Sequence, residues 1–178
     1  MSEVKSRGRA IVASAHLVSD QASELSELEY GLMIASHAFN RWIVRCMAAT
    51  GVAELGALDV TVLHSVGHRE RPKKLADICF VLNVEDSHTV SYALKKLQRL
   101  ELVKGEKSGK ETFFTLTPAG QETCQRYRQV REDCLVKALG AFASEAPDEL
   151  HRQIGDSADL LRALSGLYDQ AARAAASL

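Results

Sequence analysis

The chain has 178 residues, of which 46% are hydrophobic and 25% are charged, and its formal net charge is -1. This length fits one domain, or one domain with an appended arm, and the apolar content excludes wholesale disorder. A net charge so close to zero excludes a polyelectrolyte that binds anions over its whole surface. We find no signal sequence and no apolar run of the roughly 18 residues that a membrane span needs, so we expect a cytoplasmic protein that binds no membrane.

The charge is unevenly distributed along the chain. Between Arg69 and Lys110 there are ten lysines and arginines against six acidic residues, a local charge of +4. A basic middle between more acidic ends favours one surface that faces an anion. The 4 cysteines are dispersed, without a C-x-x-C pair, which is typical of buried thiols in a reducing compartment.

The N-terminal part of the chain is predicted to hold a flexible arm, residues 1–20, and one long helix within residues 21–53. Apolar residues recur every three or four positions along that helix, so one of its faces is apolar throughout. Ser26 and Glu29 fit a capping box at the start of the helix, and Gly51 fits its end.

Residues 54–117 are predicted to form three short helices followed by a β-hairpin. The hydrophobic period changes from helical to strand-like after the third of these helices, and the tip KSGK supplies the turn. The expected bounds are about Gly56 to His68, Pro72 to Leu82, Asp86 or Ser87 to Leu100, Val103 to Glu106, and Thr112 to Leu116.

Residues 118–178 are predicted to form two long helices. Thr117 and Pro118 provide a cap and a first helical position, and that helix continues to about Ala143 before another helix opens at Pro147. The predicted fold is therefore mainly α, in the order α-α-α-α-β-β-α-α. The small central part cannot cover the long apolar stripes at both ends, so we predict that the terminal helices form a homodimerisation region.

The second and third short helices, joined by a polar turn, fit a helix-turn-helix, and the basic hairpin fits a wing beside it. In such a unit the second helix enters the major groove of double-stranded DNA with its N-terminal half towards the bases, while lysines and arginines further along meet phosphates. The residues that we expect to contact DNA are Ser87, His88, Thr89, Ser91, Tyr92, Lys95, Lys96, Arg99, Lys107 and Lys110.

The stretch LADICFVLNVEDSHTVSYALKKLQRLELVKGEKSGKETFFTLTPAGQE resembles the MarR-type winged helix-turn-helix transcription regulators of bacteria. The resemblance lies in the "TVS" core, the spaced leucines and the "LTPAG" step out of the hairpin. It implies a homodimeric repressor that binds a pseudo-palindromic site and is released by a small aromatic or phenolic ligand. Two departures stand out: Glu101 replaces a common glycine, and the wing tip lacks the usual Asp-Arg pair.

A ligand of that kind would lie between the first helix and the second. The residues that we nominate for effector binding are His37, Arg41, Trp42, Arg45 and His64, because an indole can stack an aromatic ring and an arginine can pair with a carboxylate. The simpler interpretation places Trp42 in the core and the arginines in salt bridges of the dimer.

Other functions have weaker support in the sequence. A winged-helix module that binds proteins could use the same surface. Cys46 and Cys124 lie near arginines and are candidates for a redox sensor, although nothing visible lowers a thiol pKa. His64 and His68 are spaced for a metal but lack a third ligand, so we expect no metal and no cofactor. No catalytic motif appears, and we expect no enzyme.

Overall fold

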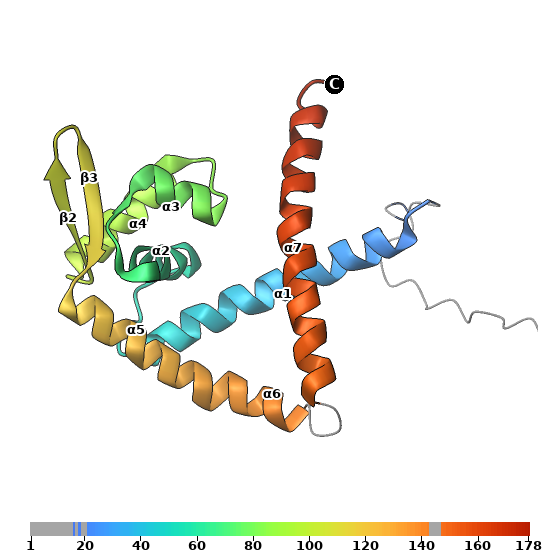
Figure 1. Ribbon diagram of the computed structural model, residues 1–178, viewed down its shortest axis with the longest axis horizontal. Helices are drawn as coiled ribbons and strands as arrows, with labels where there is room; N and C mark the ends of the chain where they lie inside the picture. The colour runs from blue at the N-terminus through green and yellow to red at the C-terminus, as the bar shows by residue number, and fades with distance from the viewer. Residues whose placement is uncertain (1–15, 17, 19–20, 143–146) are drawn as a thin grey trace, which may run out of the picture. The chain divides into compact units, whose positions relative to one another are not determined.

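The computed structural model describes residues 16, 18, 21–142 and 147–178. The chain divides into two compact units, Met1–Arg128 and Gln129–Leu178, and each is described by itself. The first unit holds α1 to α4, a small sheet and most of α5, and the second holds the remainder of that helix and α7 (Figure 1). Most of the predicted arm, residues 1–20, lies outside the described residues.

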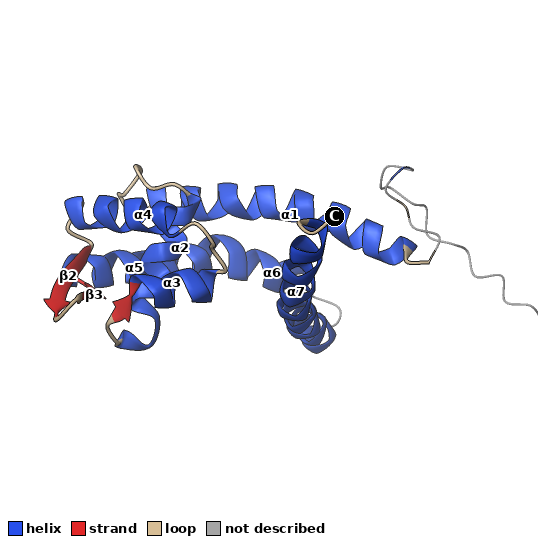
Figure 2. Cartoon of the chain, turned by 90° about the horizontal axis from the view of Figure 1, so that it is seen from above, coloured by secondary structure: helices blue, strands red, loops and turns tan. Residues whose placement is uncertain are grey.

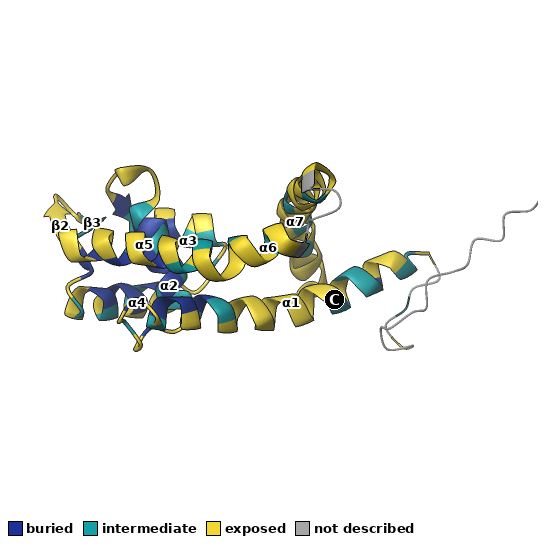
Figure 3. Cartoon of the chain, turned by 90° about the horizontal axis from the view of Figure 1, so that it is seen from below, coloured by how far each residue is buried: buried dark blue, intermediate teal, exposed yellow. Residues whose placement is uncertain are grey.

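Helix α1 (Ser23–Ala48) is the first long element. It starts one turn before Ser26, so Ser26 is a buried residue within the helix and not its cap. The N-cap residue is Ala22, which makes no side-chain cap. The capping box predicted at Ser26 is therefore wrong. The C-terminal end of α1 is covered through Ile43, Cys46 and Met47, while the middle of the helix, residues 31–41, is exposed (Figure 3).

Three short helices, α2 (Ala57–Gly67), α3 (Leu75–Leu82) and α4 (Ser87–Arg99), form the centre of the first unit. Their apolar faces meet in a core in which Leu63, Ile78 and Leu97 are fully buried. Of the two starts expected for α4, Asp86 or Ser87, the structure has Asp86 as the cap: its carboxylate accepts a hydrogen bond from the backbone N–H of His88 at 2.9 Å. The helix-turn-helix is thus built from α3, the turn at Asn83 and α4.

The sheet contains a strand that the sequence did not indicate. The described strands are β1 (Lys73–Lys74), β2 (Val103–Ser108) and β3 (Glu111–Leu116), in the antiparallel order β1-β3-β2 (Figure 2). Lys73 pairs with Phe114, and its ammonium donates to the carbonyls of His68 and Arg71. The prediction that Pro72 opens a helix is wrong, because these pairings draw both lysines into the sheet.

Helix α5 (Pro118–Arg131) leaves the wing through a tight junction. The Thr117 hydroxyl accepts from the N–H of Gly120 at 3.0 Å and donates to the carbonyl of Glu101 at 2.5 Å, which confirms the predicted cap. Gly120 lies so close to the preceding chain that a Cβ there would be 2.0 Å from the carbonyl oxygen of Leu102. This contact fixes the base of the hairpin, where β2 begins, against the start of α5.

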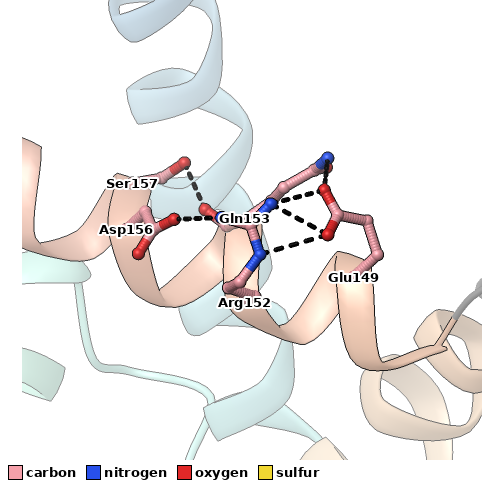
Figure 4. Close-up of polar contacts among 5 residues, drawn as sticks. All are labelled: Glu149, Arg152, Gln153, Asp156 and Ser157. Carbon is pink, nitrogen blue, oxygen red and sulfur yellow. Dashed lines mark hydrogen bonds and ion pairs between the residues drawn. The ribbon is translucent and has the colours of Figure 1, made fainter.

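The helix that begins with α5 continues through a π-helical segment, η3 (Glu132–Val136), into α6 (Lys137–Phe142). The prediction of one long helix to about Ala143 is therefore confirmed, with an irregular turn that the period did not indicate. In the second unit α7 (Pro147–Ala175) carries a polar ladder in which Arg152 pairs with Glu149 at 2.7 Å and with Asp156 at 3.0 Å (Figure 4).

The backbone at Glu101 gives the first prediction. Glu101 has a φ of 57°, in the left-handed region where a Cβ costs about 1 kcal/mol and glycine pays no such penalty. The substitution Glu101→Gly should therefore raise the free energy of unfolding by about 1 kcal/mol, measured by urea denaturation. Glu101→Ala keeps the Cβ and is the matched control; equal stabilisation by both variants would contradict the backbone explanation.

Candidate nucleic-acid interface

The outward face of α4 carries most of the residues that the sequence nominated for DNA contact. Its N-terminal half presents His88, Thr89 and Tyr92 to solvent, and Tyr92 is 70% exposed. The opposite face of the helix is buried in the core, so this polar face cannot turn inward. An exposed aromatic ring and short polar groups at the start of a helix suit contact with base edges and sugars in a major groove.

Some hydrogen-bonding groups at the start of α4 already have partners within the chain. Asp86 accepts from the N–H of His88, and the hydroxyl of Thr89 donates to the Asp86 carbonyl at 2.7 Å. A carboxylate at this helix end carries the same sign of charge as a phosphate. The positive charge near this face therefore comes from the cations further along α4 and in the wing.

The basic residues of α4 fall into two groups. Lys95 and Arg99 are exposed, and the Lys95 ammonium lies 5.5 Å from the ring centroid of Tyr92. Lys96 is half-buried, and its ammonium forms an ion pair with Asp59 of α2 at 2.7 Å. The structure thus brings Lys95 and Arg99 to the same face as Tyr92 and directs Lys96 towards α2.

The wing protrudes beside α4 and is exposed along nearly all of β2 (Figure 1). Its tip turns at Gly109, whose φ of 63° suits glycine, and Lys107 and Lys110 flank that turn. Both lysines are exposed and form no ion pair within the part of the chain that the structure describes. Lys104, in contrast, is paired with Glu106 at 2.6 Å, so the free positive charge of the wing lies at its tip.

The residues nominated for an effector separate into two places. His37, Arg41 and Arg45 line an open cavity of about 490 Å³ on α1, near the start of α2. His64 lies elsewhere, on the side of α2 that faces α5, and Trp42 is half-buried and lines neither cavity. The five residues nominated for an effector therefore do not line one common cavity in this structure.

The cavity beside His64 also has a volume of about 490 Å³ and lies between α2, β3 and α5. Sequence reasoning missed most of its wall, because β3 and α5 follow α2 by some fifty residues. The polar groups that line it are His64, His68, Glu70, Arg71, Thr115, Gln121, Cys124, Gln125 and Arg128.

Two buried polar atoms of this second cavity have no partner. The Nε2 atom of His64 and the hydroxyl oxygen of Thr115 are shielded from solvent and make no hydrogen bond within the described ranges. Burial lowers the pKa of His64 below its ordinary value, so its ring is neutral at pH 7, and it packs edge-on against Tyr127 at 4.4 Å between ring centroids. Buried polar groups normally find partners, so these two atoms are suited to receive a polar ligand.

The two cysteines nominated as redox sensors, Cys46 and Cys124, are buried and half-buried. Burial raises the pKa of Cys124 to about 11, which is the opposite of what a reactive thiolate needs. Cys46 is buried, with its sulfur 3.6 Å from the carbonyl of Tyr127. In the described part of the chain, no three His, Cys, Asp or Glu side chains gather as a metal site would require, and no helix is both long and apolar enough to span a bilayer.

The buried histidine gives the second prediction. Because the folded-state pKa of His64 lies below its unfolded value, the unfolded chain binds more protons as pH falls below about 6.5. The stability that neutral His64 contributes is therefore complete at pH 7 and is lost as the solution is acidified towards pH 5. His64→Leu should make the melting temperature fall less steeply over this range in calorimetry.

The matched control is His88→Leu, which makes the same substitution at an exposed position of α4 and is measured over the same pH range. A His64→Leu protein whose melting temperature falls as steeply as that of the wild type would contradict the assignment.

Comparison with known proteins gives the architecture a family context. Residues 55–120 match the family model described as "Winged helix DNA-binding domain". No curated protein sequence matches the chain. Among solved structures, it is similar to a MarR-family transcriptional regulator from Rhodococcus sp. RHA1, with 14% identity, a TM-score of 0.62, and coverage of 80% of this chain and 96% of that chain.

Two further solved structures carry bound molecules in their names. One is Staphylococcus aureus MarR in complex with salicylate and kanamycin, with 19% identity, a TM-score of 0.61, and coverage of 80% of this chain and 96% of that one. The other is the transcriptional repressor CouR bound to a 23-mer DNA duplex, with 19% identity, a TM-score of 0.63, and coverage of 79% and 96%. Residues 55–120 thus match the winged helix DNA-binding model, and the chain has a fold similar to that of the MarR-family transcription regulators.

Proposed function

We propose that this protein is a sequence-specific DNA-binding transcription regulator, a homodimeric repressor that leaves a pseudo-palindromic site when a small aromatic or phenolic ligand binds. The observation that carries this proposal is the exposed face of α4, where His88, Tyr92, Lys95 and Arg99 stand beside a wing with free lysines at its tip. A similar fold belongs to CouR, which is named as a repressor and was solved on DNA.

The distribution of charge supports a nucleic-acid partner. The chain has a net charge of -1, yet ten basic and six acidic residues lie between Arg69 and Lys110, the part that contains α4 and the wing. Lysines and arginines that neutralise phosphates release counterions, and this release supplies much of the affinity for DNA. A protein with this charge pattern would approach DNA with one face only.

The uncovered apolar side chains support a homodimer. On α1, Met33 and Ile34 are each 51% exposed and Phe39 is 57% exposed. On α7, Leu160 and Leu167 are also exposed. Apolar side chains spaced along two long helices are typical of surfaces that a second subunit covers, and two-fold symmetry is the commonest arrangement. A dimer would present two α4 helices to successive major grooves.

The cavity between α2, β3 and α5 supports a small-molecule effector. Its volume of about 490 Å³ suits a ligand of the size of a substituted benzoic acid or phenol. The unpartnered atoms of His64 and Thr115 could hydrogen-bond a carboxylate or hydroxyl, and Arg71 and Arg128 supply positive charge at the same cavity. A protein of similar fold, Staphylococcus aureus MarR, was solved with salicylate.

A winged-helix module that binds a protein partner is the alternative, and the salt dependence of binding distinguishes the two. For the third prediction, a duplex from upstream of the protein's own gene is titrated at several salt concentrations, with fluorescence anisotropy as the readout. Lys95→Ala should weaken binding to every duplex and reduce the slope of log K against log salt by about 0.9 for each subunit, which is about 1.8 for the dimer. Ser91→Ala and His88→Ala should instead change which sequences are preferred.

Lys137→Ala is the matched control, because Lys137 is an exposed lysine of α6 paired with Asp133 and far along the chain from the wing. It should leave both affinity and slope unchanged. If the wild-type protein fails to bind the duplex at low salt, the DNA-binding proposal is overturned in favour of the interaction module.

The fourth prediction concerns the effector, with salicylate as the probe. Thr115→Val removes the unpartnered hydroxyl while keeping the shape of the side chain, so about tenfold more salicylate should be needed to release DNA. Thr61→Val, in α2, is the control and should respond as the wild type does. If Arg41→Ala loses the response and Thr115→Val retains it, the ligand binds at the α1 cavity instead.

A further inference from the structure

One carboxylate oxygen joins two helices of the DNA-binding domain. The Oδ2 atom of Asp59 accepts from the backbone N–H of Gly56 at 2.9 Å, which caps the start of α2. The same oxygen accepts from the ammonium of Lys96 in the middle of α4 at 2.7 Å. Asp59 therefore ties the first turn of α2 to the helix that carries the candidate base contacts.

This pair differs from the other ion pairs of the described chain in its burial. The side chains of Lys96 and Asp59 are 29% and 14% exposed, whereas in every other pair both partners are at least 39% exposed. A partly buried pair is screened less by water and salt than a surface pair, and loss of one partner leaves the other charge poorly solvated. Most surface ion pairs contribute little to stability, so we expect this pair to contribute more than the others.

The direction of the Lys96 side chain also separates it from Lys95 and Arg99, the exposed basic residues of α4. Successive residues of a helix point about 100° apart, so Lys96 cannot share the face of Lys95. Lys95 is exposed, whereas Lys96 lies beside Leu97, which is fully buried. The ammonium that sequence spacing assigned to a phosphate is held at the α2 side of the helix.

We propose that Asp59 and Lys96 are positioning residues that hold α4 in the orientation needed to read DNA, and that Lys96 is not a phosphate contact. This inference rests on the proposed function, because it assigns a role to two residues within that DNA-binding surface. Asp59 lies outside α4 and the wing, so a DNA contact surface drawn from those elements alone would omit it.

The two roles for Lys96 predict opposite effects of one substitution. If Lys96 contacts a phosphate, Asp59→Asn removes a competing carboxylate and a negative charge, so DNA binding should tighten. If the pair positions α4, the same change releases the helix and binding should weaken. Asparagine can still accept from the N–H of Gly56, so the cap of α2 is retained in this variant.

The experiment compares wild-type protein with Asp59→Asn, Lys96→Met, the double variant and the matched control Lys95→Met. Affinity for the upstream duplex is measured at several salt concentrations, well below the melting temperature of each variant. We expect Asp59→Asn and Lys96→Met each to weaken binding about tenfold, with the salt slope of the wild type. The double variant should lose no more than the worse single variant, while Lys95→Met should lower the slope by about 0.9 for each subunit, which is about 1.8 for the dimer.

A second measurement on the free protein does not depend on DNA. Under brief acetylation read by mass spectrometry, Lys96 should react more slowly than Lys95, and Asp59→Asn should raise the rate at Lys96 towards that at Lys95. Tighter DNA binding by Asp59→Asn, a lowered salt slope in Lys96→Met, or equal acetylation of the two lysines in the wild type would each overturn the positioning role. Failure of the wild type to bind DNA would overturn the proposed function instead. The acetylation rates would still test whether Asp59 holds the Lys96 ammonium in the free protein.

Discussion

The burial of the apolar face of α4 is the constraint on which the rest of the domain depends. Val90, Leu94 and Leu97 are each no more than 2% exposed, packed in the core that α2 and α3 complete. Because that face is fixed inward, the polar residues of α4 are fixed outward on a rigid helix. The wing and the cap at Thr117 are then built onto the same core, so the polar face of α4 and the basic hairpin are presented together.

The positive charges of this domain fall into two groups, exposed cations and cations that pair within the chain. Lys95, Arg99 and the wing-tip lysines are exposed, whereas Lys73 and Lys96 are taken up by internal partners. A count of basic residues therefore overstates the cations available to DNA. Helix α2 carries residues on both sides of the proposed switch, since Asp59 pairs with Lys96 of α4 and His64, five residues later, lines the cavity proposed for the effector.

The sequence predicted the elements whose signals are local. Helical periodicity, a cap at Asp86 or Ser87, the Thr117 cap and the glycine turn of the wing all depend on neighbours within a few residues, and all were found, whereas the equally local capping box at Ser26 was wrong. The strand at Lys73 escaped notice because two lysines show no apolar alternation, and its pairing with β3 is some forty residues distant. The Lys96 pair with Asp59, 37 residues away, and the wall of the His64 cavity were hidden for the same reason.

The central claim is that the face formed by α4 and the wing binds double-stranded DNA in a specific, electrostatically assisted way. The most direct test is the affinity of the full chain for a duplex from upstream of its own gene, measured against salt and against an unrelated duplex of equal length. The account predicts tighter binding to the upstream duplex and a log–log salt slope of several units, as expected when several phosphates are neutralised. Equal affinity for both duplexes, or no binding at low salt, would contradict it.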